Sequence, residues 1–247
     1  MLRIEKVSAG YGNLQVLDDV TVEAARGKIT VIVGPNGSGK STLLKTIAGL
    51  TRIYRGGISF DDRLISGLEP HIIARMGIAY LPQTDMTFTQ LTVKENFKMA
   101  GYTVTPIDFE ERLKKSLQLF PKISSYMNTK VVNLSGGERQ MVAMIMALLR
   151  RPSVIMFDEP TANLAPIIAT QVLQTISSLS VDSGLTTLLV EQNATRALQM
   201  GDSAYLLVSG RVAFQGPCKD LLEHKELGRL YLGLGLNASQ ETSPEDN

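Results

Sequence analysis

The residues best suited to chemistry form a glycine-rich loop that closes on a lysine and a serine. An apolar, β-branched stretch at residues 29–33 precedes this loop, and a helical pattern at residues 42–48 follows it. Glycines allow backbone N–H groups to wrap around phosphate oxygens, and the start of a helix adds a partial positive charge. This is the arrangement of a nucleotide-binding P-loop. We therefore expect nucleotide contacts from Gly34, Pro35, Asn36, Gly37, Ser38, Gly39, Lys40, Ser41 and Thr42.

Two carboxylates end another apolar stretch, at residues 154–157. Asp158 is placed to hold Mg²⁺ through water, and the Ser41 hydroxyl supplies a direct ligand. Glu159 comes one residue later, where it can polarise a water molecule for in-line attack on a γ-phosphate. An acidic pair at a strand end is weak by itself, but it becomes informative because it follows a P-loop. Lys40 would contact the β- and γ-phosphates, so the expected cofactors are ATP and Mg²⁺.

A second helix start, about a hundred residues after the first, has an unusual pair of glycines. Ser135 and Glu138 have the spacing of a capping box, which alone explains a helix start there. Capping does not explain Gly136 and Gly137, because each glycine in a helix costs up to about 1 kcal/mol relative to alanine. Bare backbone at a helix start suits the close approach of an anion. We expect all four residues to contact a nucleotide.

The elements that position these residues read as strands, then helices, then strands again. Strand patterns cover residues 2–7, 20–23, 56–61 and 77–81, besides the two apolar stretches above. A helical pattern runs from about residue 92 to residue 151, and a buried strand returns at 186–190. We expect helices between and after these later strands. The order predicts a parallel-sheet α/β core that is interrupted by a helical subdomain.

Composition excludes several other classes of protein. Twenty-five basic and 24 acidic residues leave a net charge of +1, so we expect no nucleic-acid partner. Cys218 is the only cysteine, which excludes a disulfide within the chain. The N-terminus carries charges where a signal peptide needs an apolar run, and the longest apolar stretch, 141–149, is half the length of a membrane span.

Residues 134–140, Leu-Ser-Gly-Gly-Glu-Arg-Gln, resemble the signature motif of ATP-binding cassette (ABC) ATPases, and the resemblance covers nearly the whole chain. It implies a P-loop NTPase (RecA-like) α/β core with a small antiparallel β-subdomain and an inserted α-helical subdomain. It also implies one domain over residues 1–236, with the core at 1–84 and 152–236 and the helical subdomain at 85–151. The polar, acidic residues 237–247 are expected to be a disordered tail.

The same resemblance implies partners and further site residues. Two cassettes dimerise head to tail, so that the signature helix of each caps the nucleotide on the other's P-loop. Two transmembrane permease subunits would hold the pair at the cytoplasmic face of the membrane, with an extracytoplasmic solute-binding protein acting indirectly. Tyr11 resembles the aromatic residue that stacks on adenine, although it could simply pack at a strand end, and Val16 is expected beside it. Gln83 resembles the glutamine that touches Mg²⁺ and the attacking water.

Three apolar residues just after Gln83 have two open interpretations. Met86, Phe88 and Phe97 either line a groove for the permease or pack in an ordinary core.

Two positions depart from the general family. Ala165 stands where most cassettes have aspartate, and Gln192 stands where most have a histidine that contacts the γ-phosphate. An amide can donate a hydrogen bond to phosphate but cannot carry a charge, so we expect slower hydrolysis or dependence on a partner subunit that is a different chain. A homodimer stays open.

These departures resemble the shorter ATPase subunit of branched-chain amino acid importers. Importers of amides or urea, and a soluble ABC ATPase of the iron–sulfur assembly type, remain alternatives. A P-loop kinase or GTPase would leave the second helix start unexplained.

Overall fold

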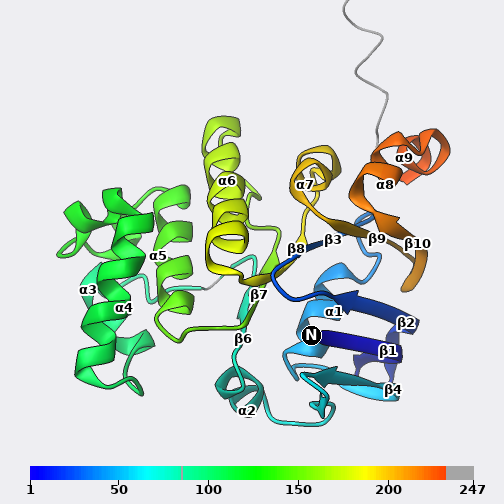
Figure 1. The fold of residues 1–247 in the computed structure, drawn as a ribbon, viewed down its shortest axis with the longest axis horizontal. Helices are drawn as coiled ribbons and strands as arrows, with labels where there is room; N and C mark the ends of the chain where they lie inside the picture. Colours follow the sequence, from blue (N-terminus) through cyan, green and yellow to red (C-terminus); the bar gives the residue numbers. More distant parts are fainter. Residues whose placement is uncertain (85, 232–247) are drawn as a thin grey trace, which may run out of the picture.

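Two β-sheets of different kinds build the protein, as Figure 1 shows for the computed structural model. The structure describes residues 1–84 and 86–231, so the predicted disordered tail at 237–247 lies outside the described residues. The larger sheet has six strands in the order β10-β9-β3-β8-β7-β6, and the smaller has four in the order β2-β1-β4-β5. This combination confirms the predicted α/β core with a small antiparallel β-subdomain.

The six-stranded sheet is parallel except at β10, which pairs antiparallel with β9. Every residue of β3, β7 and β8 is buried, because helices cover the sheet on one side and the β-subdomain with α1 covers it on the other. The bounds of these strands are β3 Ile29–Val33, β6 Ile78–Leu81, β7 Val154–Asp158, β8 Thr186–Val190, β9 Ser203–Val208 and β10 Arg211–Pro217.

The register of the parallel strands brings their carboxyl ends to one edge of the sheet. Asp158 at the end of β7 lies opposite Val190 at the end of β8, and Leu81 at the end of β6 lies opposite Phe157. The P-loop follows β3 at the same edge. In open α/β sheets this edge is where ligands bind.

The β-subdomain packs on one face of the large sheet with helix α1 between them. Its strands are β1 Leu2–Tyr11, β2 Leu14–Ala24, β4 Arg52–Phe60 and β5 Arg63–Leu64, and α1 spans Lys40–Ile47. Leu43, Leu44 and Ile47 of α1 belong to one buried cluster with β1, β2 and the strands of the large sheet. The P-loop is therefore anchored at both ends, by β3 and by a fully packed helix.

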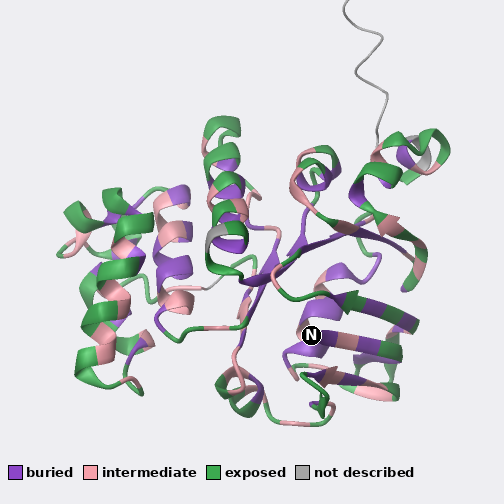
Figure 2. Cartoon of the chain, in the orientation of Figure 1, coloured by how far each residue is buried: buried purple, intermediate pink, exposed green. Residues whose placement is uncertain are grey.

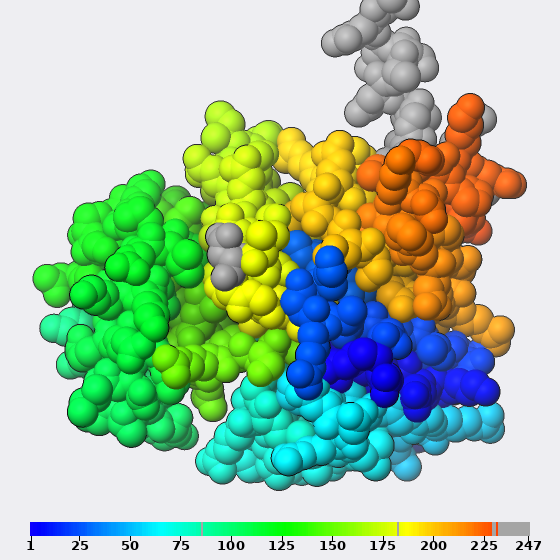
Figure 3. Space-filling view, in the orientation of Figure 1, coloured from blue at the N-terminus to red at the C-terminus, as the bar shows by residue number. Residues whose placement is uncertain are grey.

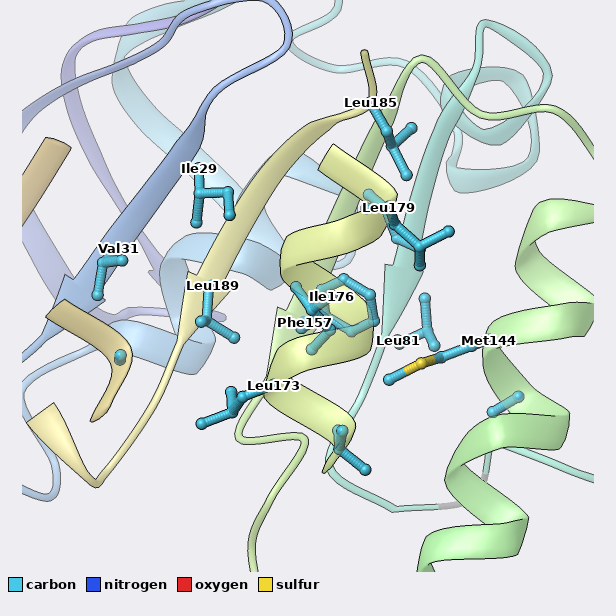
Figure 4. Close-up of a cluster of buried hydrophobic side chains, with 14 of the residues drawn as sticks. Ile29, Val31, Leu81, Met144, Phe157, Leu173, Ile176, Leu179, Leu185 and Leu189 are labelled. Atoms are coloured by element: carbon cyan, nitrogen blue, oxygen red, sulfur yellow. The ribbon is translucent and has the colours of Figure 1, made fainter. Parts of the chain in front are cut away.

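The other face of the large sheet carries the main hydrophobic core. Figure 4 shows Phe157 and Leu189 of the sheet against Ile176 of α6, with Met144 of α5 reaching the same cluster. The helices on this side include α3 Val93–Ala100, α4 Pro106–Leu119, α5 Gly136–Leu148, α6 Pro166–Ser183 and α7 Ala194–Met200. Their inner faces are buried while their outer faces are exposed (Figure 2).

Helices α3, α4 and α5 form one side of the molecule, and the β-subdomain lies on the other (Figure 3). Between α4 and α5 the chain makes two short 3₁₀ segments, η1 Pro121–Tyr126 and η2 Val131–Asn133. The remaining helices are α2 Pro70–Arg75, α8 Cys218–Glu223 and α9 Lys225–Tyr231. None of the helices in residues 1–84 and 86–231 has the length and hydrophobicity to cross a bilayer.

Helices follow β8 as expected, but two strands that the sequence analysis did not predict follow it as well. Besides α7, α8 and α9, the chain adds β9 and β10, a hairpin that turns at Ser209 and Gly210. β9 is a short apolar run without period-two alternation, because it pairs with β3 in the interior of the sheet.

Candidate active site

The P-loop is built around glycines that no other residue could replace. Gly34 has φ 150°, and a Cβ there would lie 2.0 Å from the carbonyl oxygen of Leu207. Gly39 precedes α1 with φ 101°, so the helix begins without any side-chain cap. The first N–H groups of α1 are therefore directed to whatever the loop encloses.

Lys40 and Ser38 face the inside of this loop. Lys40 is only 4% exposed, and its ammonium donates to the carbonyl oxygens of Gly34 at 2.9 Å and Pro35 at 3.0 Å. Burial lowers the pKa of Lys40, against the opposing effects of Glu159 and Asp158. The Ser38 hydroxyl is buried and has no hydrogen-bond partner among the described residues. A buried donor without a partner at a helix start fits a bound phosphate.

Asp158 is held from two sides at the end of β7. Its Oδ1 accepts a hydrogen bond from the Ser41 hydroxyl at 2.8 Å, and its Oδ2 accepts one from the Tyr80 hydroxyl at 2.9 Å. The structure thus brings together Ser41 and Asp158, two of the three predicted magnesium ligands, the third being Gln83. Hydroxyl and carboxylate oxygens are the donor set that Mg²⁺ prefers, so these residues fit the ion. Tyr80 was not predicted from the sequence, and burial, with Asp158 nearby, raises its pKa, so the hydroxyl stays a donor.

Glu159 lies beside Gln83, the other predicted polar residue of this edge. The Gln83 amide donates to Glu159 Oε2 at 3.1 Å. Glu159 has φ 50°, an unusual conformation for a residue with a side chain, and its backbone N–H donates to the carbonyl oxygen of Val190 at 2.9 Å. The loops after β6, β7 and β8 therefore meet at Glu159.

A buried carboxylate that sequence reasoning missed joins the same loops. Glu191, 2% exposed, accepts hydrogen bonds from the Thr161 N–H at 3.0 Å, the Thr161 hydroxyl at 2.8 Å and the Gln192 N–H at 3.2 Å. Burial raises the pKa of Glu191, while these hydrogen bonds oppose the shift. A charged residue directly after the fully buried strand β8 was the available signal for it.

The second predicted helix start, at α5, has a complete capping box. The Ser135 hydroxyl accepts from the Glu138 N–H, and the Glu138 carboxylate accepts from the Ser135 N–H. Glu138 also pairs with Lys122 at 2.8 Å, and these contacts lower the pKa of Glu138 to about 2. A Cβ added to Gly137 would lie 2.3 Å from Cγ2 of Ile168, so α6 of the same chain occupies the space beside that glycine.

A cavity of about 350 Å³ joins this second helix start to the loops after β6 and β7. Its lining includes Gly136 and Arg139 of α5, Gln83, and Glu159. The glycine-rich N-terminus of α5 thus opens on the same space as the predicted base.

Comparison with known proteins decides the family. The sequence profile of the ABC transporter family matches residues 17–162, more than half of the chain and nearly all of the site just described. The chain belongs to the ABC transporter family.

Relatives in this family match the chain over almost its full length. A probable branched-chain amino acid transport ATP-binding protein, LivF, from Archaeoglobus fulgidus is 50% identical over 234 residues, covering 95% of this chain and 99% of the relative. The high-affinity branched-chain amino acid transport ATP-binding protein BraG from Pseudomonas aeruginosa is 39% identical over 233 residues, covering 94% and 100%.

Solved structures agree with this assignment. A crystal structure of an ABC transporter's ATP-binding cassette in its ADP conformation has a TM-score of 0.82 and 28% identity, covering 93% of this chain and 97% of that one. A nucleotide-free cassette has a TM-score of 0.79 and 29% identity, covering 88% and 91%. The chain is an ABC ATPase with a cassette fold.

Within this ABC cassette, the expected adenine-binding residues lie at the edge of the β-subdomain. Tyr11 ends β1 and is 43% exposed. The turn after it is held by Tyr54, whose hydroxyl donates to the carbonyl oxygen of Gly12 at 2.9 Å. Val16 lies beside the P-loop, since a Cβ on Gly39 would be 3.5 Å from its Cγ1. The nucleotide contacts of Tyr11 and Val16 stay predictions.

The two departures from the general cassette pattern lie at loop ends. Ala165 precedes α6 at the N-cap position and gives that helix no side-chain cap. Gln192 follows β8 and is exposed, with its backbone N–H bound to Glu191.

The apolar residues after Gln83 divide between the two interpretations. Phe97 is fully buried in the main core. Met86 lines an apolar groove along the edge strand β6, and Phe88 is 51% exposed.

Proposed function

We propose that this ABC ATPase is the shorter ATP-hydrolysing subunit of a branched-chain amino acid importer. The observation that carries the catalytic part is the meeting of Ser41, Asp158, Glu159 and Gln83 at one sheet edge. The substrate class is supported by two relatives named for branched-chain amino acid transport, each covered almost completely. The amide and urea importers remain the alternative for the substrate.

The residues of the site divide the work of hydrolysis. The N–H groups of the P-loop and the start of α1 bind the phosphates, and the Lys40 ammonium neutralises charge that develops on the γ-phosphate. Ser41 and Asp158 would hold Mg²⁺, which supplies electrostatic stabilisation of the phosphate oxygens when bound. Glu159 accepts a proton from the attacking water, and Gln83, bonded to Glu159, orients that water.

The active unit in this proposal is a head-to-tail pair of cassettes. The glycine-rich start of α5 supplies backbone N–H groups to the nucleotide on the partner's P-loop. Ala165 and Gln192 favour a different chain as that partner, because neither side chain offers a charge at its position.

Membrane association would use the groove beside β6. This groove has a volume of about 290 Å³, and its lining includes Leu81, Met86, Ala143 and Met146. An apolar groove directly before Gln83 suits a short helix of a transmembrane permease at the cytoplasmic face, and would carry permease movement to the Gln83–Glu159 pair. A solute-binding protein would act through the permease.

The catalytic proposal is tested with Glu159→Gln in the assembled transporter. The variant keeps the shape and loses the base, so ATP turnover should fall by about 100-fold or more while ATP binding persists. Glu223→Gln, an exposed carboxylate of α8, serves as the matched control and should turn over normally. Turnover by Glu159→Gln close to that of the control would sink the assignment of the base.

The transport proposal is tested by purification from membranes and by uptake. The chain should co-purify with hydrophobic permease subunits, and vesicles carrying the complex should take up leucine in an ATP-dependent way. Recovery of the chain without any permease would favour the soluble class of ABC ATPase, and uptake of urea or amides alone would correct the substrate.

A further inference from the structure

The Asp158 carboxylate is fixed by a residue outside the motifs named so far. Tyr80 lies on β6, pairs with Met156 of β7 in the parallel ladder, and reaches Asp158 at the end of that neighbouring strand. Its hydroxyl donates to Oδ2 at 2.9 Å, while Ser41 occupies Oδ1 at 2.8 Å. Both oxygens of the carboxylate therefore have a defined partner.

These two hydrogen bonds fix the rotation of the Asp158 carboxylate, and therefore how its oxygen atoms face the predicted Mg²⁺ ion. The terminal torsion of an aspartate is broad, so a carboxylate held at one oxygen can rotate. Asp158 is only 4% exposed, which leaves solvent little access to replace a lost partner. A neutral phenol holds Oδ2 in place without adding a positive charge that would repel a cation.

We propose that Tyr80 is a positioning residue for the metal site, where it orients Asp158 toward Mg²⁺ bound with the nucleotide. The proposal rests on the proposed function of Ser41 and Asp158 as magnesium ligands. Outer partners of metal-binding carboxylates are worth about 10- to 100-fold in metal affinity. Losing the hydroxyl should therefore weaken the contribution of Mg²⁺ without affecting the phosphate contacts of the P-loop.

The test compares ADP affinity in excess Mg²⁺ with ADP affinity in EDTA, by titration calorimetry on the full chain. ADP is not hydrolysed, so the ratio of the two affinities reports the metal site without turnover. Tyr80→Phe removes one oxygen and keeps the ring. Its Mg²⁺-dependent gain in ADP affinity should be about tenfold smaller than that of the unmodified chain, with affinity in EDTA unchanged.

Tyr205→Phe is the matched control. Tyr205 is a tyrosine of the same sheet, more buried than Tyr80, and its hydroxyl accepts from the Glu23 N–H in the β-subdomain. This control should show the full gain with Mg²⁺.

Each other outcome has one meaning. An undiminished gain in Tyr80→Phe would overturn the role of Tyr80. Loss of affinity in EDTA as well would also overturn it, because the effect would then be general to the fold. If the unmodified chain gained nothing from Mg²⁺, the magnesium site of the proposed function would fail, and the proposal for Tyr80 with it.

Discussion

The two glycine-bearing helix starts of this cassette are built in opposite ways. Helix α1 begins after Gly39 with no side-chain cap, so no capping side chain competes with a ligand for its first N–H groups. Helix α5 begins with a full capping box, and its Glu138 carboxylate is further fixed by Lys122. The first start has no side-chain cap, whereas the second is capped by its own residues at Ser135 and Glu138, and its capping box does not involve the N–H groups of Gly136 and Gly137.

The difference shows that only α1 is constructed as an independent phosphate site. A carboxylate at a helix start interacts favourably with the same partial positive charge that would attract phosphate. At α5 that position is already filled by Glu138. A nucleotide at α5 must therefore be held mainly by other residues, as expected if it sits on the P-loop of a partner cassette.

The largest expected effect is a loss of ADP affinity when the phosphate site at α1 is altered. Lys40→Ala removes charge-assisted hydrogen bonds to phosphate and should weaken ADP binding by about 100-fold, measured by titration calorimetry. Lys122→Ala, which removes from η1 the ion pair with Glu138 at the start of α5, should leave ADP affinity of the isolated chain unchanged. Equal losses in both variants would show that α5 binds nucleotide within one chain and would contradict the division described here.

The next largest effect is expected from Gly137→Ala, and it distinguishes a packing role of this glycine from a role in nucleotide binding at α5. Gly137→Ala places a Cβ against Ile168 and should lower the free energy of unfolding by about 1–3 kcal/mol, measured with urea. The double variant with Ile168→Ala should recover much of that loss relative to Ile168→Ala alone. ATP turnover of the assembled complex should stay low in both, because residue 137 lies in the first turn of α5, which the proposed function places against the partner's nucleotide.

If the double variant recovered ATP turnover as well as stability, the proposed role of Gly137 in nucleotide binding would be contradicted. Gly137 would then be required only for the contact between α5 and α6.

The smallest effect concerns the charge of Glu138. Its folded pKa of about 2 lies below the ordinary glutamate value, so the charge stabilises the fold above pH 4.5 and this contribution is lost as the pH falls toward 2. Glu138→Gln should therefore lower the free energy of unfolding by about 1 kcal/mol at pH 7, and the difference from the unmodified chain should shrink as the pH approaches 2. A difference that stays constant down to pH 2 would contradict the assignment. Glu223→Gln is the matched control.

Sequence reasoning reached the parts of the site that depend on local chemistry. The P-loop was readable because Gly34 and Gly39 need backbone conformations that only glycine adopts easily, and because an apolar strand and a helix flank them. The pairing of Ser41 with Asp158 followed from their expected roles at one magnesium ion, with Ser41 at the end of the P-loop and Asp158 at the end of an apolar strand. The antiparallel hairpin of β9 and β10 was missed, since the buried strand β9 lacks alternation.

Contacts that depend on strand neighbours could not be read from the sequence. Tyr80 meets Asp158 only because β6 is the neighbour of β7, and the order of strands is a property of the folded sheet. The link from Glu191 to Thr161 has the same origin in the adjacency of β7 and β8. Close packing against Ile168 is a second reason why residue 137 is a glycine, and it depends on how α6 packs against α5.

The backbone of Glu159 has a consequence for how this cassette can change over time. Its φ of 50° belongs to a region that costs residues with side chains about 1–3 kcal/mol, and glycine adopts it freely. A glycine at this position would relieve the local strain and also delete the carboxylate. With Glu159 as the base proposed above, selection for stability alone would move this loop away from catalysis.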